Sequence, residues 1–369
     1  MIPINRPIMG NEEADAVLKV IESGVLTNPS PEGGPNVKVF EGELASYVGA
    51  KHAVAINSGT GALFLALLAT GIGHGDEVII PSFTFIATAS TVMLTGAKPV
   101  FADIDRSTYN MSPKAFKKAM TKKTRAAMPV DLYGLPAEMD EIREIAAEEG
   151  LAVIEDACQA QGASYKGRMA GTLADIGCFS FYPGKVMTTG EGGAAVTNDG
   201  SLADKLRKMR THGQVKGYDS AMLGGNFRMP EIEAAIGRVQ LSKLPGFLKK
   251  RAENANLLTD MLNGTGVIPP IAPNGMKHNW YLYTVRCASL DERERLKARM
   301  NDEGIGATAY YPTPVNKTPY YASQGFSKIS LPETDNAADS VLSLPVNPAV
   351  TENDLERMGH IVKKACDQH

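Results

Sequence analysis

The sequence predicts an α/β protein whose main sheet is mostly parallel and covered by helices on both faces. Short β-branched apolar runs alternate with helix-length amphipathic segments from about residue 52 to residue 210, and this alternation is typical of repeated strand, helix, strand units. At 369 residues the chain exceeds the usual size of a single core. We therefore expect a large domain over residues 1–245 and a smaller C-terminal α/β domain over residues 246–369.

The elements of the large domain are expected in this order. Helices are predicted at 11–23, 37–48, 62–70, after Phe85 to about 94, 113–120, 139–150 and 202–210. Strands are predicted at 52–56, 77–80, 99–103, 126–130, 151–154, 176–182 and 194–198. Asn11 is the expected cap of the first helix. Asn57, Asp131 and Asp156 each follow a predicted strand, and ligands gather at the carboxyl ends of strands in such sheets, so these residues are expected to converge.

The large domain is expected to end with an amphipathic helix that Asn226 opens. Its apolar positions are expected to face inward; they are Ile232, Ala235, Ile236 and Val239. A hinge is predicted near Leu244-Pro245. The elements expected after it are a helix at 247–262, a strand at 282–287, a helix at 292–303, an aromatic loop at 309–312 and a helix at 352–365.

Composition excludes several classes of protein. The formal charge is −3 and the chain has no long basic run, which argues against nucleic acid or an anionic membrane as the main partner. The four cysteines show no CxxC spacing and the six histidines are dispersed, so we expect no metal site. The N-terminus lacks the pattern of a signal peptide, and no run approaches 18 apolar residues. A cytoplasmic protein is therefore expected.

Two residues of the central region point to pyridoxal phosphate (PLP). Asp156 ends a buried β-branched run, and Lys185 stands in the polar loop Pro183-Gly184-Lys185 after the next strand. PLP needs a lysine amine for a Schiff base and a carboxylate facing its pyridine nitrogen, because a protonated ring acts as an electron sink. An acid and a lysine at this spacing are more often solvated surface groups. The pair alone therefore leaves both interpretations open.

The turn Asn57-Ser58-Gly59-Thr60-Gly61 between a strand and an apolar helix is a candidate phosphate site. Small residues at a helix start expose free backbone N–H groups at the positive end of the helix dipole. The alternative is that Ser58 simply caps the helix.

Longer motifs carry a family resemblance. They are EDACQAQGA, DIGCFSFYPGK, TTGEGG, NSGTGAL, PSFTFIATA, PVFADID, PVDLYGLPAEMD, NFRMPEIEAAIGRVQL and SLPVNP. Together they resemble the DegT/DnrJ/EryC1/StrS family of PLP-dependent sugar aminotransferases, in the family's order and over nearly the whole chain. The resemblance implies the fold type I aminotransferase architecture, a large domain with a seven-stranded sheet and a small C-terminal α/β domain. It allows the N-terminal segment to pack on the small domain.

The resemblance also implies roles for single residues. Lys185 would carry the cofactor and Asp156 would face its ring nitrogen. The remaining cofactor contacts would be Gly59, Thr60 and Ser180 at the phosphate, Phe85 stacked on the ring, Gln159 at the ring oxygen or beside the ring, and Asn226 at the phosphate of the neighbouring subunit. Without the family, core packing is the default interpretation of Phe85. For Ser180 and Gln159 ordinary hydrogen bonding, and for Asn226 a helix cap, are then alternatives of equal weight to the cofactor role. A homodimer with shared active sites follows from the Asn226 role.

The substrates implied by the family are L-glutamate and a nucleotide-linked keto sugar. Two positions depart from the commoner pattern, because many members have histidine where this chain has Gln161 and Asp131. Both positions lie near the substrate in the family, so these departures bear on the sugar. The alternatives are a PLP-dependent sugar dehydratase, against which Lys185 counts, an aminotransferase of a non-sugar cyclic ketone, and a non-enzymatic regulator.

Overall fold

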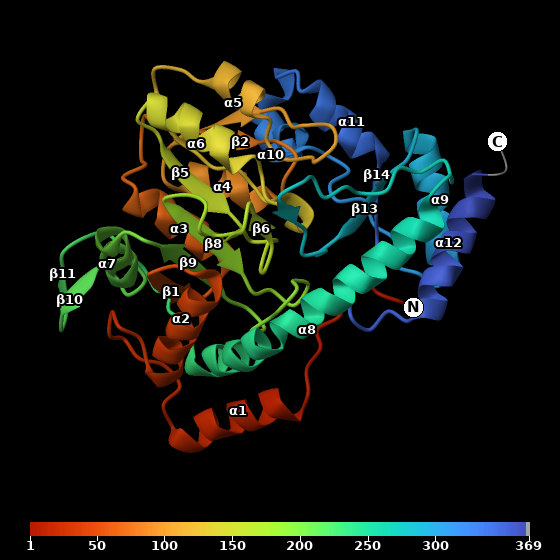
Figure 1. Ribbon diagram of the computed structural model, residues 1–369. Coiled ribbons are helices and arrows are strands. Elements are labelled where there is room, and N and C mark those ends of the chain that lie inside the picture. The colour runs from red at the N-terminus through yellow and green to blue at the C-terminus, as the bar shows by residue number, and fades with distance from the viewer. Residues whose placement is uncertain (367–369) are drawn as a thin grey trace.

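The computed structural model describes residues 1–366 and is built around one seven-stranded sheet (Figure 1). Its strands are β1 (His52–Ile56), β2 (Glu77–Pro81), β3 (Lys98–Ala102), β4 (Thr124–Ala127), β5 (Ala152–Asp156), β8 (Ile176–Ser180) and β9 (Gly193–Thr197). They lie in the order β1-β9-β8-β5-β4-β2-β3. Strand β9 is antiparallel to both of its neighbours and the other pairs are parallel. The predicted mostly parallel sheet is confirmed.

Helices cover both faces of this sheet. They are α2 (Pro35–Val48), α3 (Gly59–Ala69), α4 (Ile86–Leu94), α5 (Pro113–Ala119), α6 (Met139–Glu148), α7 (Gly200–Met209) and α8 (Glu231–Leu262). Alternate residues of β1 belong to the cores on opposite faces. Val54 and Ile56 pack with α3, α4 and α7, whereas Ala53 and Ala55 pack with α2 and α8. Helices α5 and α6 cover the second face further along the sheet, over β2 to β5.

The first helix, α1 (Asn11–Ser23), packs against α8, and its predicted bounds are confirmed (Figure 1). The predicted cap is wrong, because Gly10 and not Asn11 precedes the helix. The Glu13 carboxylate accepts a hydrogen bond of 2.8 Å from the Gly10 N–H. An acidic residue in the first turn thus satisfies the backbone N–H of the capping residue. Leu18 and Ile21 of α1 remain more than half exposed.

Helix α8 differs from the prediction in its course. It begins at Glu231, not at Asn226, whose backbone instead pairs with Thr211. It then continues through Pro245 to Leu262, so the expected break between two helices at Leu244-Pro245 is wrong, and a hinge at this point stays a prediction. Leu244 and Leu248 are both buried in the same core, and this packing holds the chain helical on either side of the proline.

The buried face of α8 also differs from the prediction. Of the four positions expected to face inward, only Ala235 is buried; the three that are only partly buried are Ile232, Ile236 and Val239. A Cβ atom at Gly237 would lie 2.9 Å from the side chains of Phe40 and Thr189. The helix therefore approaches the core through its small residues, and the larger β-branched residues lie to the sides.

The C-terminal part has its own core. Strands β13 (Tyr283–Arg286) and β14 (Val341–Leu344) pair antiparallel, and their core partners come from α9 (Leu290–Asp302), α12 (Glu352–Cys366) and the part of α8 after Ala255. The division between the predicted domains thus falls inside a continuous helix, and it stays a proposal. Helix α10 (Pro319–Ser323) packs on the large core through Tyr321, although it follows the small-domain helix α9.

The N-terminal segment runs to the C-terminal part, where the Ile2 N–H donates to Gly304 O at 2.8 Å. The remaining elements are the sheet of β6 (Ser164–Tyr165), β7 (Arg168–Met169) and β12 (Met276–Lys277), the hairpin of β10 (Gln214–Lys216) and β11 (Asp219–Ser220), helix α11 (Pro332–Ser340), and the 3-10 turns Leu132–Gly134, Val315–Lys317 and Phe326–Lys328. Among residues 1–366 no helix combines the length and apolar character that a membrane span requires.

Candidate active site

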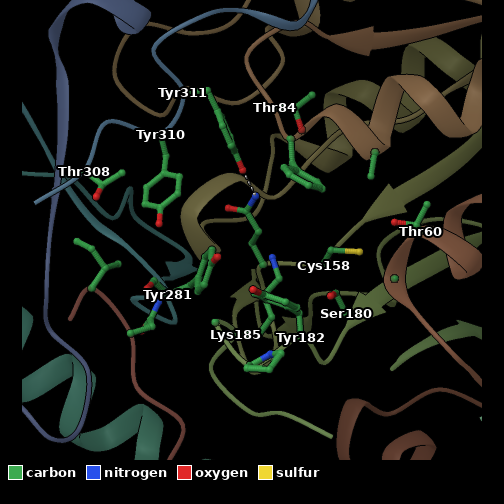
Figure 2. A pocket seen from close by; sticks show the side chains of 18 of the residues that line it. Thr60, Thr84, Cys158, Ser180, Tyr182, Lys185, Tyr281, Thr308, Tyr310 and Tyr311 are labelled. Atoms are coloured by element: carbon green, nitrogen blue, oxygen red, sulfur yellow. Dashed lines mark hydrogen bonds between the residues drawn. The ribbon is translucent and has the colours of Figure 1, made fainter. Parts of the chain in front are cut away.

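A cavity of about 970 Å³ opens at the carboxyl ends of the parallel strands. Figure 2 shows its lining, which comes from the ends of β5 and β8, the start of α3, the segment before α4, the loop at 308–311 and the N-terminal segment. Seven of the eight predicted site residues line it; they are Gly59, Thr60, Phe85, Asp156, Gln159, Ser180 and Lys185. The topology therefore brings together residues that lie far apart in the sequence.

Asp156 is the last residue of β5 and is 4% exposed. Its Oδ2 atom accepts a hydrogen bond of 2.9 Å from the Thr88 hydroxyl, and its Oδ1 atom accepts one of 3.3 Å from the Cys158 N–H. Burial raises the pKa of Asp156, and the hydrogen bonds from Cys158 and Thr88 together with the charge of Lys185 act in the opposite direction. A buried carboxylate with a nearby cation suits a site that binds a positively charged ring nitrogen.

The start of α3 is the place where an anion site is predicted. Ser58 caps the helix by accepting a hydrogen bond of 3.0 Å from the Gly61 N–H, so the capping interpretation is correct. The N–H groups of Gly59 and Thr60 belong to the first turn, where a helix has no acceptor of its own for them. A Cβ atom at Gly59 would lie 2.6 Å from the Ser180 Cβ. Glycine is therefore required for Ser180 to approach the helix start, and the cradle fits a phosphate group.

The predicted ring contacts come from two other segments. Phe85 precedes α4 and is 54% exposed at the cavity. Gln159 is almost fully buried, its Oε1 atom accepts from the Tyr133 N–H at 2.8 Å, and its Nε2 atom donates to the Tyr311 hydroxyl at 3.4 Å (Figure 2). Phe85 also contacts Tyr311, with ring centroids 6.3 Å apart. A lysine, a buried carboxylate, a phosphate cradle and two flanking side chains together fit PLP.

Asn226 is the predicted site residue that does not line this cavity. Its side chain is exposed, and its backbone carbonyl accepts a hydrogen bond of 3.5 Å from the Asn57 side chain. The Asn57 N–H in turn donates to Phe227 O at 2.9 Å. The Asn226 segment thus lies beside the phosphate cradle of its own chain without entering the cavity, and its role toward a neighbouring subunit stays a prediction.

Gln161 and Asp131, the two positions that lie near the substrate in the family, do not line the cavity, and their bearing on the sugar stays a prediction. The Gln161 amide donates to the carbonyl oxygens of Ser180 and Cys158 beneath the site. Asp131 is fully buried and accepts a hydrogen bond of 3.0 Å from the Ala137 N–H. Both side chains point into the protein, because each has a hydrogen-bonding partner there.

Asp131 and Glu155 form a buried carboxyl pair. Both are fully buried, and Glu155 accepts hydrogen bonds from the N–H groups of Gly171 at 2.6 Å and Leu173 at 2.9 Å. Burial raises the pKa of Asp131 well above its ordinary value, and the charge of Glu155 raises it further. Burial raises the pKa of Glu155 as well, but its hydrogen bonds from the N–H groups of Gly171 and Leu173 oppose that rise, so we expect the proton of the pair to reside on Asp131.

Substitution Asp131→Asn tests this assignment. The pKa of Asp131 is higher in the folded state than in the unfolded state. Its favourable contribution to the free energy of unfolding is therefore complete below the unfolded-state pKa and is lost as the pH rises toward the folded-state pKa. Asparagine has nearly the same size and carries no proton that titrates in this range. We expect the variant to gain stability relative to the wild type as pH rises from about 4.5 to about 8. Melting temperatures of the cofactor-free proteins at the two pH values measure the change.

Asp140→Asn is the matched control. Hydrogen bonds from Lys166 and Arg168 lower the pKa of Asp140, so this substitution should give a small effect of opposite sign on an exposed group. If the melting temperatures of wild type and Asp131→Asn differ by the same amount at both pH values, the assignment of the proton to Asp131 is wrong.

Several cavity residues escaped sequence reasoning. They are Asn5, Thr88, Cys158, Tyr281 and Tyr310. The aromatic loop at 309–312 is visible in the sequence, but nothing local indicates that it faces the cavity. Asn5 and Tyr281 are separated by 276 positions, and yet the Asn5 side chain donates to Tyr281 O at 3.3 Å. Only the fold brings such residues to one place.

Comparisons with known proteins show which family this chain resembles. Residues 7–363 match the model of the DegT/DnrJ/EryC1/StrS aminotransferase family. The chain is 39% identical over 386 residues to the spore coat polysaccharide biosynthesis protein SpsC of Bacillus subtilis (strain 168), covering 99% of this chain and 98% of the relative. It is 41% identical over 336 residues to dTDP-3-amino-3,4,6-trideoxy-alpha-D-glucose transaminase of Streptomyces venezuelae, covering 90% and 86%.

The solved structure of DesV from S. venezuelae, in complex with a ketimine intermediate, is similar to this chain with a TM-score of 0.92 and 38% sequence identity. The alignment covers 97% of this chain and 95% of that one. The predicted fold, the aminotransferase class and the cofactor PLP are confirmed. Because the family model spans nearly the whole chain, this protein belongs to the DegT/DnrJ/EryC1/StrS aminotransferase family.

Proposed function

We propose that this protein transfers an amino group from L-glutamate to the keto group of a nucleotide-linked sugar. The observation that carries the proposal is the convergence of Lys185, Asp156 and the start of α3 in one cavity of about 970 Å³. A cavity of this size at the carboxyl ends of the strands has room for a cofactor and part of a substrate. The name of the Streptomyces venezuelae relative, which is a dTDP-amino-sugar transaminase, supports the substrate class.

We assign the following roles in amino transfer to residues of this chain. Lys185 holds the cofactor and moves a proton with its Nζ atom. Asp156 stabilises positive charge on the ring nitrogen, and the N–H groups of Gly59 and Thr60 with the Ser180 hydroxyl bind the phosphate. When bound, PLP supplies the electron sink that stabilises negative charge on the carbon that loses the proton.

The outer part of the cavity suits a sugar. Its polar lining there comes from Asn5, Asn301, Thr308 and Tyr310, and Figure 2 shows Thr308 and Tyr310 on the side of the small domain. Amide and hydroxyl groups donate and accept hydrogen bonds, as sugar hydroxyls do. Carbohydrate recognition at this end would leave the keto carbon at the Lys185 end.

A panel of acceptors tests the proposal. The enzyme with PLP and L-glutamate is offered UDP-, dTDP- and GDP-linked keto sugars and one cyclic ketone without a nucleotide, and mass spectrometry follows the products. We expect an amino sugar, and an equal amount of 2-oxoglutarate, from at least one nucleotide-linked acceptor. Amination of the free cyclic ketone alone would assign the protein to the non-sugar alternative. Loss of a sugar hydroxyl without gain of nitrogen would assign it to the dehydratase alternative.

We further propose a homodimer with shared active sites. Tyr218 at the tip of the β10–β11 hairpin is 99% exposed and Leu223 is 76% exposed. Leu18 and Ile21 of α1 are also exposed apolar residues. A second subunit would cover such side chains, and a two-fold arrangement would place Asn226 of each chain toward the other site.

Subunit complementation is the measurement that checks this arrangement. Mixing Lys185→Ala with Asn226→Ala under subunit exchange should produce mixed dimers, each with one intact site and one doubly damaged site. A 1:1 mixture would then recover about a quarter of wild-type activity, since half of the dimers are mixed. Native mass spectrometry confirms the exchange. No recovery in exchanged dimers would mean that Asn226 serves its own chain's cofactor or none.

A further inference from the structure

We propose that Tyr281 is a further catalytic residue, because the face of its ring lies against the amine of Lys185. The Lys185 Nζ atom is 4.6 Å from the ring centroid, within the distance of about 6 Å at which a cation and an aromatic face attract each other. Figure 2 shows the Tyr281 ring in the cavity on the same side as Lys185. The inference rests on the proposed role of Lys185 in proton transfer.

The proton transfer explains why the ring matters. The C–H bond of the amino donor breaks, its electron pair stays on the carbon side, and the proton forms an N–H bond at Lys185 Nζ. Lys185 then carries an ammonium group until it delivers the proton to the second of the two carbons between which transamination moves it. An aromatic face attracts the ammonium and not the neutral amine, so Tyr281 lowers the energy of the charged state.

The main chain of Tyr281 is fixed from several sides. Its N–H donates to the Asn279 Oδ1 atom at 2.8 Å, and its carbonyl accepts from Asn5 at 3.3 Å and from Arg251 at 3.4 Å. Asn279 donates to Gln159 O at 2.8 Å, which ties the segment to a predicted cofactor contact. Arg251 is itself 1% exposed, so one of these partners is held in the interior of the protein.

The residue before Tyr281 is held in a strained conformation. Trp280 has φ of +57°, which is rare for a bulky side chain. Its N–H donates to the His278 Nδ1 atom at 2.9 Å, and the two rings are stacked with centroids 4.2 Å apart. Burial lowers the pKa of His278 to about 3, so the imidazole is neutral and Nδ1 can accept the bond. Strain of this kind persists where the surroundings fix a functional geometry.

Substitution of the ring tests the proposal. Tyr281→Phe keeps the aromatic face, whereas Tyr281→Leu removes it. We expect the donor half-reaction with L-glutamate in single turnover to slow by about 5- to 30-fold in the leucine variant and to stay near wild type in the phenylalanine variant. The isotope effect with α-deuterated glutamate should rise in the leucine variant, because proton transfer becomes slower, while its KM and its PLP affinity stay near wild type.

A second measurement needs no bound cofactor. In the apoprotein, acetic anhydride labels the neutral amine of Lys185, and exposed Lys51 serves as internal standard. We expect Tyr281→Leu to raise the labelling rate at pH 7 more than at pH 10. Loss of the ring removes an attraction that favours the ammonium, so the fraction of neutral, reactive amine increases only at a pH where the ammonium predominates. A change of access alone would raise both rates equally. Where the leucine variant fails to fold, Tyr281→Met replaces it with the same expected results.

Three outcomes would overturn the role of the ring. They are wild-type turnover in the leucine variant, equal slowing in the phenylalanine and leucine variants, and labelling rates raised equally at both pH values. The second outcome would assign the effect to the hydroxyl. These outcomes are distinguishable from failure of the proposed function. In that case the wild type itself would show no amino transfer to any acceptor. The labelling experiment would still report on the contact between Tyr281 and Lys185.

Discussion

Lys185→Ala is expected to abolish amino transfer while leaving PLP able to bind through the phosphate cradle. Removing the proton carrier alone should slow turnover by about 10²- to 10⁴-fold, and loss of the covalent attachment adds to this. Borohydride reduction followed by peptide mass spectrometry should find the cofactor on Lys185 in the wild type and on no residue in the variant. A small primary amine in the buffer should restore part of the turnover, since it can replace the missing base.

Lys166→Ala is the matched control for this substitution. Lys166 is an exposed lysine paired with Asp140 at 2.8 Å, away from the cavity, and its loss should leave turnover unchanged. If Lys185→Ala kept wild-type turnover, or if reduction fixed the cofactor to a different lysine of the wild type, the base and the attachment point would lie elsewhere.

Asp156→Asn is expected to give the second largest loss. The amide keeps the size of the side chain and can still accept a hydrogen bond from Thr88, but it carries no charge to stabilise a protonated ring nitrogen. Loss of one preorganised charged partner in a buried site corresponds to about 10²- to 10³-fold in turnover. Equilibrium titration of the apoprotein with PLP should show a far smaller change in affinity, because the phosphate contacts are intact.

Asp140→Asn, at an exposed ion pair, controls for a general effect of losing a carboxylate. A thermal melt of Asp156→Asn separates loss of charge from loss of fold, because the asparagine fits the same buried space. Near-native turnover in Asp156→Asn with bound cofactor would remove Asp156 from the proposed role.

The sequence by itself determined the layers of the large domain and most of its cavity. The strand at 52–56 is predicted correctly because a buried strand consists of a short run of apolar residues. Asp156, Lys185 and the turn at Gly59 were candidates because cofactor chemistry requires an acid, an amine and free N–H groups at strand ends. The local pattern left the alternatives open, and the resemblance of the longer motifs to the family favoured the cofactor interpretation.

Only the tertiary structure decided the features that depend on distant neighbours. Pro245 lies inside a helix because buried leucines on both sides outweigh its local preference, and the sequence pattern predicted a hinge. The Asp131 side chain lies in the core because it bonds to the Ala137 N–H there, whereas the family resemblance implied only a position near the substrate. Tyr281 reaches Lys185 because Asn5 and Arg251, far away in the chain, hold its backbone. Such contacts have no local signal, because chain folding alone sets the distance between the partners.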